Sequence, residues 1–260
     1  ELDEAGTVLP ANSLLWSKRL PELPAIPWVV FCSPPYDLYL QQELAVKVLH
    51  ASVSGSIVDV KRFQQEAKAL GTLNHPNIIA IKDFGFTARG EAFLAMEYVK
   101  GFALGDLVEK STCLTVQETA SVMIQVCDAL LHAHGEGIVH RDLKPSNIMC
   151  SPGPNGKMDV KVVDFGLAKI TGRDDIDVIK LTQTGACYGS PPYMSPEQCL
   201  SKSVDFRTDI YALGCILYEC VVGKSPFVGG SVYETLTMQV TDPAPDFPDS
   251  VSVPPEYRKM

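Results

Sequence analysis

The chain has 260 residues, which is enough for one domain with a large core or for two smaller lobes. Its 46% hydrophobic and 20% charged residues are typical of a globular protein and exclude a disordered or fibrous one. The formal net charge of −9 does not favour a general nucleic-acid-binding role, so we expect no nucleic-acid partner.

The eight cysteines show no spacing that points to a metal site. None forms a C-x-x-C pair, and we expect reduced, mostly buried thiols in a cytoplasmic protein. No apolar stretch is long enough to span a membrane, since the longest candidate, residues 210–222, is short and contains Glu219. We therefore expect membrane association only through segments outside this chain, if any.

The first hundred residues predict a small sheet with one helix. Residues 1–27 are punctuated by prolines and show no clear period, so we expect an irregular lead-in. Ser56 and Asp59 give a capping-box-like start to a helix over 56–73, with Phe63, Ala67 and Leu70 on one face. Strands are expected at 28–32, 44–49, 78–84 and 92–99, the last two joined by a turn at Gly90. We assign residues 28–99 to one lobe.

Residues 100–260 predict a second, mainly helical lobe. Thr115 and Glu118 form a capping box for a helix that runs to about His134. Short strands are expected within 138–165, joined by a turn at 155–156. Residues 210–222 are apolar nearly all round, so we expect a buried central helix there. One more helix is expected near Tyr233.

The strongest chemical signal is the segment 140–147, with the sequence HRDLKPSN. Phosphoryl transfer to a hydroxyl needs a carboxylate that orients the hydroxyl and accepts its proton. It also needs an oxygen ligand for magnesium and a cation near the moving phosphate. Asp142, Asn147 and Lys144 supply these three groups within six residues. Eight residues in this order argue against the alternative, a chance polar loop after a helix.

Two further charged residues fit the same chemistry. Asp164, in Asp164-Phe165-Gly166, follows an apolar run and would bind magnesium, although a plain strand-end turn is the alternative. Lys47 lies in an apolar strand, where an unpaired ammonium group is costly. Its expected partners are Glu66 and the phosphates of ATP, while the alternative is a lysine that snorkels from an edge strand.

In this order and context, the motifs resemble the protein kinase superfamily, and within it the eukaryotic-like serine/threonine kinases found in bacteria. The resemblance runs from about residue 43 to the end. It implies a two-lobed α+β kinase fold that uses ATP and Mg²⁺ to phosphorylate Ser and Thr hydroxyls of a protein partner. The implied residues are Asp142, Lys144, Lys47 and Glu66 for catalysis; Ala45, Lys47, Met96, Glu97, Val99, Asn147 and Asp164 for ATP; and Asn147 and Asp164 for the metal.

The resemblance also implies regulation by phosphorylation. Arg141 would pair with a phosphate on the activation loop, and Thr182 and Thr184 are the expected autophosphorylation sites, unless they are plain loop threonines. Residues 189–198, GSPPYMSPEQ, resemble the loop that faces the substrate in bacterial kinases. Asp209, at the start of the buried helix, would brace residues 140–147.

The chain departs from the family pattern at both ends. No glycine occurs between Gly6 and Gly55, so the glycine-rich loop over the ATP phosphates is missing. This keeps open a second interpretation, a pseudokinase that acts as a binding or scaffold module. A third, a small-molecule kinase of the aminoglycoside-phosphotransferase type, is disfavoured by residues 189–198 and by Lys144-Pro145. We also expect the second lobe to be incomplete at its C-terminal end.

Overall fold

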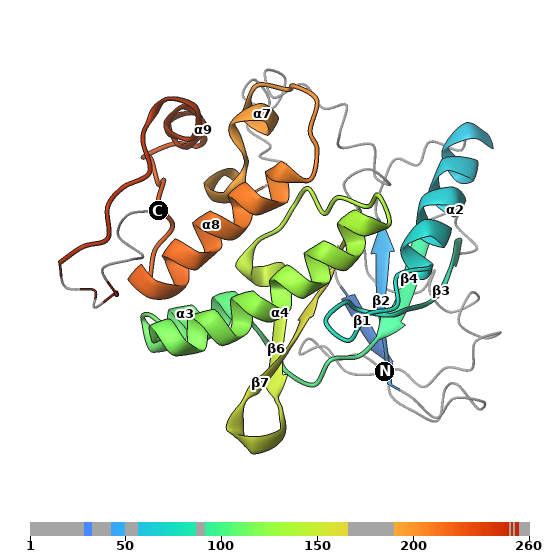
Figure 1. Ribbon diagram of the computed structural model, residues 1–260. Helices are drawn as coiled ribbons and strands as arrows, with labels where there is room; N and C mark the ends of the chain where they lie inside the picture. The colour runs from blue at the N-terminus through green and yellow to red at the C-terminus, as the bar shows by residue number, and fades with distance from the viewer. Residues whose placement is uncertain are drawn as a thin grey trace, which may run out of the picture. The chain divides into compact units, whose positions relative to one another are not determined.

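The computed structural model describes residues 29–32, 43–49, 57–86, 92–165, 190–249, 251 and 253–254 (Figure 1). They form two compact units. The first comprises the described residues up to His75 together with Ile79–Val99. The second comprises Pro76–Ile78 and the described residues from Lys100 onward. An antiparallel sheet with one helix and a mainly helical second unit confirm the expected α+β class.

The first unit contains a four-stranded antiparallel sheet in the order β1-β2-β4-β3. Its strands are β1 (Val29–Cys32), β2 (Leu44–Leu49), β3 (Ile81–Phe86) and β4 (Ala92–Glu97). The strand expected at 78–84 begins later. Ile78 instead forms a parallel bridge with Val162 in the second unit, and the N–H of Glu97 donates to the Ala80 carbonyl.

Helix α2 (Ile57–Gly71) packs against β3 of this sheet. Phe63 is buried on the expected face, with ring centroids 6.2 Å from Phe84 and 5.1 Å from Phe86. Ala67 and Leu70 are buried on the same face, so the helical period of the sequence is confirmed. The expected cap at Ser56 and the turn at Gly90 lie outside the described residues.

The second unit begins with β5 (Phe102–Ala103), α3 (Leu104–Ser111) and α4 (Val116–Gly135). The capping box of α4 is confirmed, because the Thr115 N–H donates to Glu118 at 2.9 Å and the Glu118 N–H donates to Thr115 Oγ1 at 3.2 Å. Gly137 follows the helix with φ 73°, a conformation that favours glycine. The sequence did not separate α3 from the general helical pattern.

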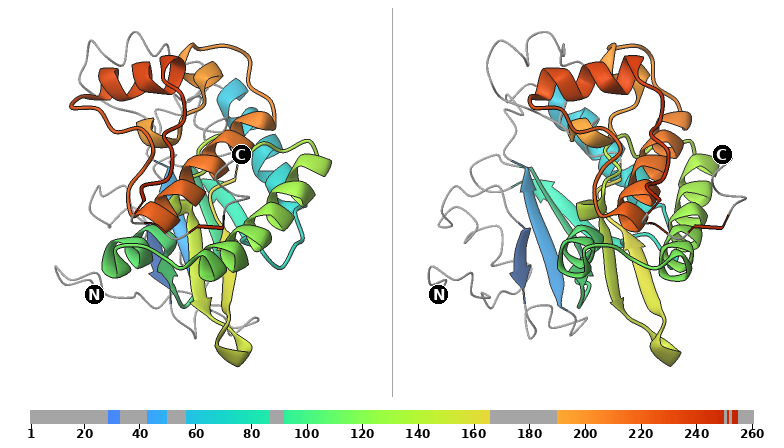
Figure 2. Two further views of the ribbon diagram at one scale, coloured as in Figure 1. Left: turned by 60° about the vertical axis from the view of Figure 1, so that its left-hand side comes forward. Right: turned by 90° about the vertical axis from the view of Figure 1, so that its left-hand side faces the viewer.

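A three-stranded sheet, β5-β6-β7, lies beside α4 (Figure 2). Its hairpin consists of β6 (Ile148–Pro152) and β7 (Met158–Val162). The expected two-residue turn is wrong, since a 3-10 turn over Pro154–Gly156 lies within a longer connection. The expectation of strands from residue 138 is also wrong for residues 138–147. Side chains, rather than a neighbouring strand, bind the backbone of residues 140–142.

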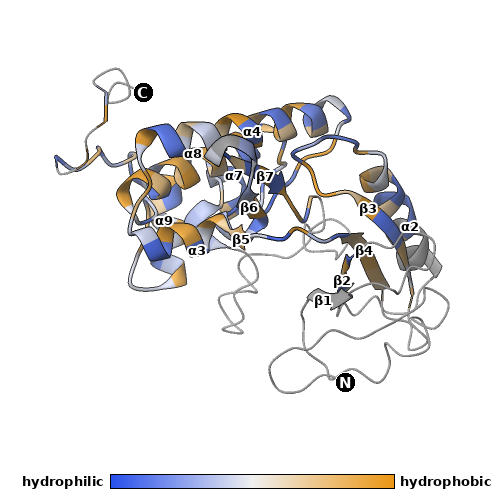
Figure 3. Ribbon diagram, turned by 90° about the horizontal axis from the view of Figure 1, so that it is seen from below, coloured by the Kyte–Doolittle hydropathy of each residue, from blue (hydrophilic) through white to orange (hydrophobic). Residues whose placement is uncertain are grey.

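Helices α7 (Pro196–Cys199), α8 (Arg207–Val222) and α9 (Val232–Thr241) complete the unit. Polar and hydrophobic residues mix along α4 and α8 (Figure 3). The prediction of a helix buried all round is wrong for α8, because Ile210 is 53% exposed on one side. At the end of α8, a Cβ on Gly223 would lie 2.0 Å from the Thr112 carbonyl oxygen, so only glycine fits there.

Six cysteines lie in the described part of the chain, and all six are free thiols. Cys150, Cys215 and Cys220 are buried, whereas Cys113 and Cys127 are exposed, so the expectation of mostly buried thiols is too general. Among the helices that the structure describes, none combines the length and apolar character needed to cross a bilayer.

Candidate active site

Asp142 lies in the loop 140–147 between α4 and β6, which we call the catalytic loop. Its carboxylate is 3.0 Å from the Lys144 ammonium group, and both side chains are partly exposed. The side-chain amide of buried Asn147 donates to the Asp142 carbonyl at 2.8 Å, and the Asn147 N–H donates to the Lys144 carbonyl at 2.9 Å. The three residues that the sequence singled out therefore lie together, with Lys144 at the Asp142 carboxylate and Asn147 at the backbone of the loop.

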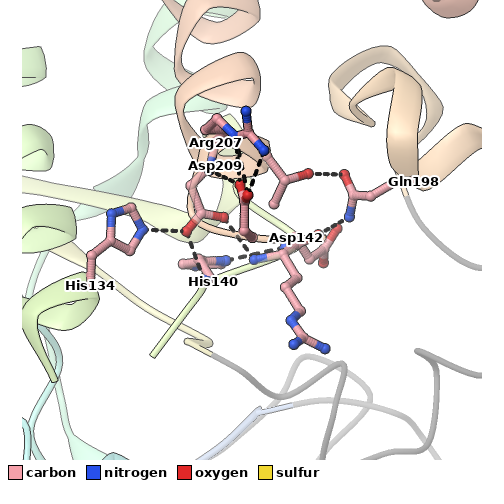
Figure 4. Close-up of polar contacts among 9 residues, drawn as sticks. His134, His140, Asp142, Gln198, Arg207 and Asp209 are labelled. Carbon is pink, nitrogen blue, oxygen red and sulfur yellow. Dashed lines mark hydrogen bonds and ion pairs between the residues drawn. The ribbon is translucent and has the colours of Figure 1, made fainter. Parts of the chain in front are cut away.

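Asp209, in the first turn of α8, anchors this loop through its backbone (Figure 4). Its side chain is 1% exposed and accepts the backbone N–H groups of His140 and Arg141, each at 2.8 Å. The ring Nε2 of His134, on α4, lies 2.8 Å from the same carboxylate. Three donors offset the cost of burying this charge, and the expected bracing role of Asp209 is confirmed.

His140 connects the catalytic loop to the segment that carries Asp164. Its Nε2 lies 2.9 Å from the Val163 carbonyl, and its Nδ1 lies 3.3 Å from the Asp142 N–H. Since a carbonyl only accepts and an N–H only donates, this geometry assigns the neutral tautomer with the proton on Nε2. The ring also packs on Phe165, with 4.7 Å between the ring centroids.

Two residues of the site have left-handed backbones without being glycine. Arg141 has φ 67° and Asp164 has φ 66°. Such conformations cost about 1–3 kcal/mol each and persist only where the surroundings hold them. Here the Arg141 N–H is held by Asp209, and the Val163 N–H donates to the Asn147 carbonyl at 2.9 Å. Strain of this kind is typical of a functional site.

The side chains of Asn147 and Asp164 suit a hard cation. The Asn147 amide nitrogen is used by the Asp142 carbonyl, so its oxygen is the atom left to face a metal. Asp164 is partly exposed and adds a carboxylate. Mg²⁺ typically takes one or two such ligands and completes its shell with phosphate oxygens and water. Within the described ranges, no cluster of three His, Cys, Asp or Glu residues could hold a metal by itself.

Residues 190–198, which we call the acceptor loop, are held by side chains from α8, α9 and the segment between them. The Tyr193 hydroxyl donates to Glu219 at 2.5 Å, and Gln239 Nε2 donates to the Pro191 carbonyl at 2.9 Å. The Ser225 hydroxyl donates to the Pro192 carbonyl at 3.2 Å. Burial raises the pKa of Glu219, and the hydrogen bond from Tyr193 opposes that rise.

Gln198 is a residue of this site whose role the sequence did not reveal. Its Nε2 donates to the Arg141 carbonyl at 2.7 Å (Figure 4). Its Oε1 accepts the Ser195 N–H at 3.0 Å and the Thr208 hydroxyl at 2.9 Å. The S-x-x-Q spacing signals the local capping box of α7 but says nothing of a contact with residue 141.

The residues expected to bind the rest of ATP lie in the first unit. Ala45 is buried opposite Met96 in the β2–β4 ladder, and Lys47 follows on the same face of β2. Glu66 lies on α2 and is partly exposed, as is Lys47. A pairing of Lys47 with Glu66 stays a prediction.

Two residues expected to bind ATP, Glu97 and Val99, lie at the end of β4 and just beyond it. The Glu97 N–H donates to the Ala80 carbonyl at 3.0 Å, and the Glu97 carboxylate accepts the Ala80 N–H at 2.9 Å. Val99 follows directly and is partly exposed. The N–H of Glu97 is therefore committed within the unit.

Thr182 and Thr184 lie outside the described residues, so their phosphorylation stays a prediction.

Comparison with known proteins gives a consistent result. Residues 37–257 match the family model described as "Protein kinase domain". Serine/threonine-protein kinase pkn3 of Myxococcus xanthus is 43% identical over 209 residues, which is 80% of this chain and 38% of that protein. Serine/threonine-protein kinase PknB of Mycobacterium leprae is 40% identical over 213 residues, 80% of this chain and 33% of that protein. The chain thus spans little more than a third of the length of these curated relatives.

Proposed function

This chain belongs to the protein kinase domain family, and from that membership we propose that it is a serine/threonine protein kinase that uses ATP. The observation that carries the proposal is the arrangement of the catalytic loop. An accessible Asp142 carboxylate lies beside the Lys144 cation, and hydrogen bonds hold the backbone on both sides of Asp142. The names of the bacterial relatives favour Ser and Thr acceptors in a protein substrate.

In the proposed reaction, Asp142 orients the acceptor hydroxyl and receives its proton. The hydroxyl oxygen bonds to the γ-phosphorus while the bond from that phosphorus to the bridging oxygen breaks, and ADP leaves. Lys144 offsets the negative charge on the moving phosphoryl group. Positioning of this kind, rather than covalent participation of the protein, supplies most of the catalysis in phosphoryl transfer.

The first unit would bind the remainder of the nucleotide. Lys47 would hold the α- and β-phosphates, with Glu66 as its partner on α2. The Glu97 N–H is already bonded within the unit, so its carbonyl and the backbone of Val99 are the groups we assign to adenine. Ala45 and Met96, both buried and paired across the sheet, would border the base.

Mg²⁺ is the metal we propose, held by Asn147 and Asp164. When bound, it would neutralise charge on the phosphate oxygens. Of the two protein ligands, Asn147 is fixed by its bond to the Asp142 carbonyl, while Asp164 follows a strand end whose backbone is bonded to both Asn147 and His140.

Regulation and location follow the same reasoning. Arg141 would bind a phosphate at Thr182 or Thr184, because a guanidinium pairs well with phosphate.

Free thiols at all six described cysteines favour a reducing compartment, so we propose a cytoplasmic domain. Any membrane contact would come from segments outside this chain.

The proposal is tested by incubating the chain with γ-labelled Mg-ATP and a Ser/Thr-containing protein, beside the Asp142→Asn and Asp142→Ala variants. We expect label in the wild type and a loss of about a hundredfold or more in both variants. Unlabelled wild-type protein that still binds ATP would support the pseudokinase interpretation, which the missing glycines before Gly55 motivate. Label on small alcohols but never on protein would instead favour a small-molecule kinase.

A further inference from the structure

We propose that Gln198 is a positioning residue for phosphoryl transfer, because it holds the peptide group that joins Arg141 to Asp142. The inference deepens the proposed function and rests on it. Gln198 lies in the acceptor loop, at position N3 of α7, and is the member of that loop whose side chain reaches the backbone next to Asp142. It would thereby link the part of the site that meets the acceptor to the carboxylate that takes its proton.

The backbone around Asp142 is held at four successive points. The Arg141 N–H donates to Asp209, and the Arg141 carbonyl accepts Gln198 Nε2. The other side of that same peptide, the Asp142 N–H, donates to His140 Nδ1 at 3.3 Å. The Asp142 carbonyl accepts Asn147. The His140 bond is long, so the Gln198 bond at 2.7 Å is the shorter restraint on the peptide from residue 141 to 142.

This peptide needs a restraint because Arg141 has φ 67°. A non-glycine residue in that conformation gains energy by relaxing, and relaxation turns the following peptide plane. Turning that plane moves the Cα–Cβ bond of Asp142 and hence its carboxylate. Displacements of about 1 Å at a reacting group are enough to slow a reaction by about a hundredfold.

The side-chain amide of Gln198 can both cap α7 and bind the Arg141 carbonyl. Its oxygen accepts two donors, from Ser195 and Thr208, while its nitrogen supplies the one donor that the Arg141 carbonyl needs. A glutamate at this position would keep the capping box, which accepts Glu as readily as Gln. It would lose the donor when ionised and regain one when protonated. Gln198→Glu therefore separates capping of α7 from positioning of Asp142.

The experiment compares Gln198→Glu with a matched control, Glu118→Gln. The control makes the reverse exchange at N3 of the α4 capping box, where Glu118 is exposed and bonded to Thr115. For Gln198→Glu we expect kcat to fall by about tenfold with the KM for ATP unchanged, because Asp142 is held less well in its reactive position. The deficit should shrink as the pH falls and the new carboxyl group protonates. The control should keep wild-type kcat and show no such recovery.

A second measurement does not depend on catalysis. The amide proton of Asp142 belongs to the peptide whose carbonyl Gln198 binds, so its NMR shift and exchange rate should change in Gln198→Glu but not in Glu118→Gln. Wild-type kcat, or an unchanged Asp142 amide, overturns the inference. If the wild-type chain transfers no phosphate, the proposed function fails. The NMR shift and exchange rate of the Asp142 amide proton then test the role of Gln198 by themselves. Should Gln198→Glu not fold, Gln198→Met, which also lacks the donor, is measured in the same way.

Discussion

The catalytic loop and the acceptor loop are both irregular segments of the second unit, but different groups hold them. A buried carboxylate, that of Asp209, holds the catalytic loop by its backbone N–H groups. Donors from neutral side chains, those of Gln239 and Ser225, hold the acceptor loop by its carbonyls. Charge-assisted hydrogen bonds are roughly twice as strong as neutral ones, so the backbone of the first loop is fixed more firmly than that of the second. The carboxyl group of Glu219 binds the side chain of Tyr193 in the acceptor loop, not its backbone.

The difference fits the two tasks that we propose. The chemistry of phosphoryl transfer is the same for every acceptor, so the geometry around Asp142 has to be constant. The surface that meets the acceptor has to match one substrate among many, and weaker neutral restraints are easier to alter without loss of the fold. Changes to the catalytic loop should therefore affect turnover and stability strongly, and changes to the acceptor loop should affect substrate recognition mildly.

The largest effect is expected for Asp209→Ala. The substitution leaves the N–H groups of His140 and Arg141 without an acceptor, and each buried donor left unsatisfied costs about 1–3 kcal/mol. Denaturant titration should show this loss of unfolding free energy, together with loss of phosphate transfer. The matched control is Asp205→Ala, which removes a more exposed carboxylate bonded to the N–H and the side chain of Arg207. It should lower the unfolding free energy by no more than about 1 kcal/mol and leave phosphate transfer unchanged. Equal effects of the two substitutions would contradict the special role of the buried anchor.

A smaller effect is expected for Asn147→Ala. The change leaves the Asp142 carbonyl without its side-chain donor and should lower the unfolding free energy by about 1–3 kcal/mol, beside a loss of activity from the proposed metal site. Chemical unfolding of Asn147→Ala and of its exposed neighbour Ser146→Ala provides the comparison. Identical unfolding curves for the two variants would show that Asn147 does not restrain the loop.

Much of this arrangement could be predicted from the sequence, because local motifs carried it. The HRDLKPSN segment placed Asp142, Lys144 and Asn147 together, and the spacing of Phe63, Ala67 and Leu70 gave the buried face of α2. The bracing role of Asp209 was predicted from the resemblance to protein kinases rather than from a local sequence pattern. The predictions that failed depend on how segments far apart in the sequence pack together. Ile78 pairs with Val162 instead of extending β3, and Ile210 faces solvent on a helix whose sequence is apolar nearly all round.

The role of Gln198 could not be predicted for the same reason. A capping box is a local signal, and Gln198 satisfies it completely through Ser195. Its contact with the Arg141 carbonyl joins residues 57 positions apart, which no periodicity or spacing encodes. Gln239 and Ser225 are similar cases, since each is an ordinary polar residue until the fold brings it to a carbonyl of the acceptor loop.

The next prediction concerns pH. Burial raises the pKa of Glu219 above its ordinary value of 4.5, so the folded chain holds this proton to a higher pH than the unfolded chain does. As the pH rises from that value through the raised pKa, Glu219 should lower the stability of the fold. The unfolding free energy of the wild type relative to that of Glu219→Gln isolates this contribution. It should fall as the pH rises over that range. Tyr193→Phe, which removes the hydrogen bond opposing the rise, should extend the range upward.

A difference between wild type and Glu219→Gln that is constant with pH would contradict this view of the acceptor loop. It would mean that the pKa of Glu219 is the same in the folded and the unfolded chain. The hydrogen bond between Tyr193 and Glu219 would then restrain the acceptor loop to the same degree across that pH range.

The smallest effect is expected for Ser225→Ala, which removes one neutral hydrogen bond to the Pro192 carbonyl. A neutral bond of this kind contributes about 0.5–1.5 kcal/mol, so the unfolding free energy should fall by no more than that. Because Pro192 lies in the loop proposed to meet the acceptor, the KM for a protein substrate should rise by about two- to threefold, while kcat and the KM for ATP stay the same. The control is Thr237→Ala, an exposed hydroxyl on α9 that bonds only within its own helix among the contacts described. If Ser225→Ala lowered kcat instead, the acceptor loop would share the positioning task of the catalytic loop, and its restraint by neutral groups would no longer distinguish recognition from chemistry.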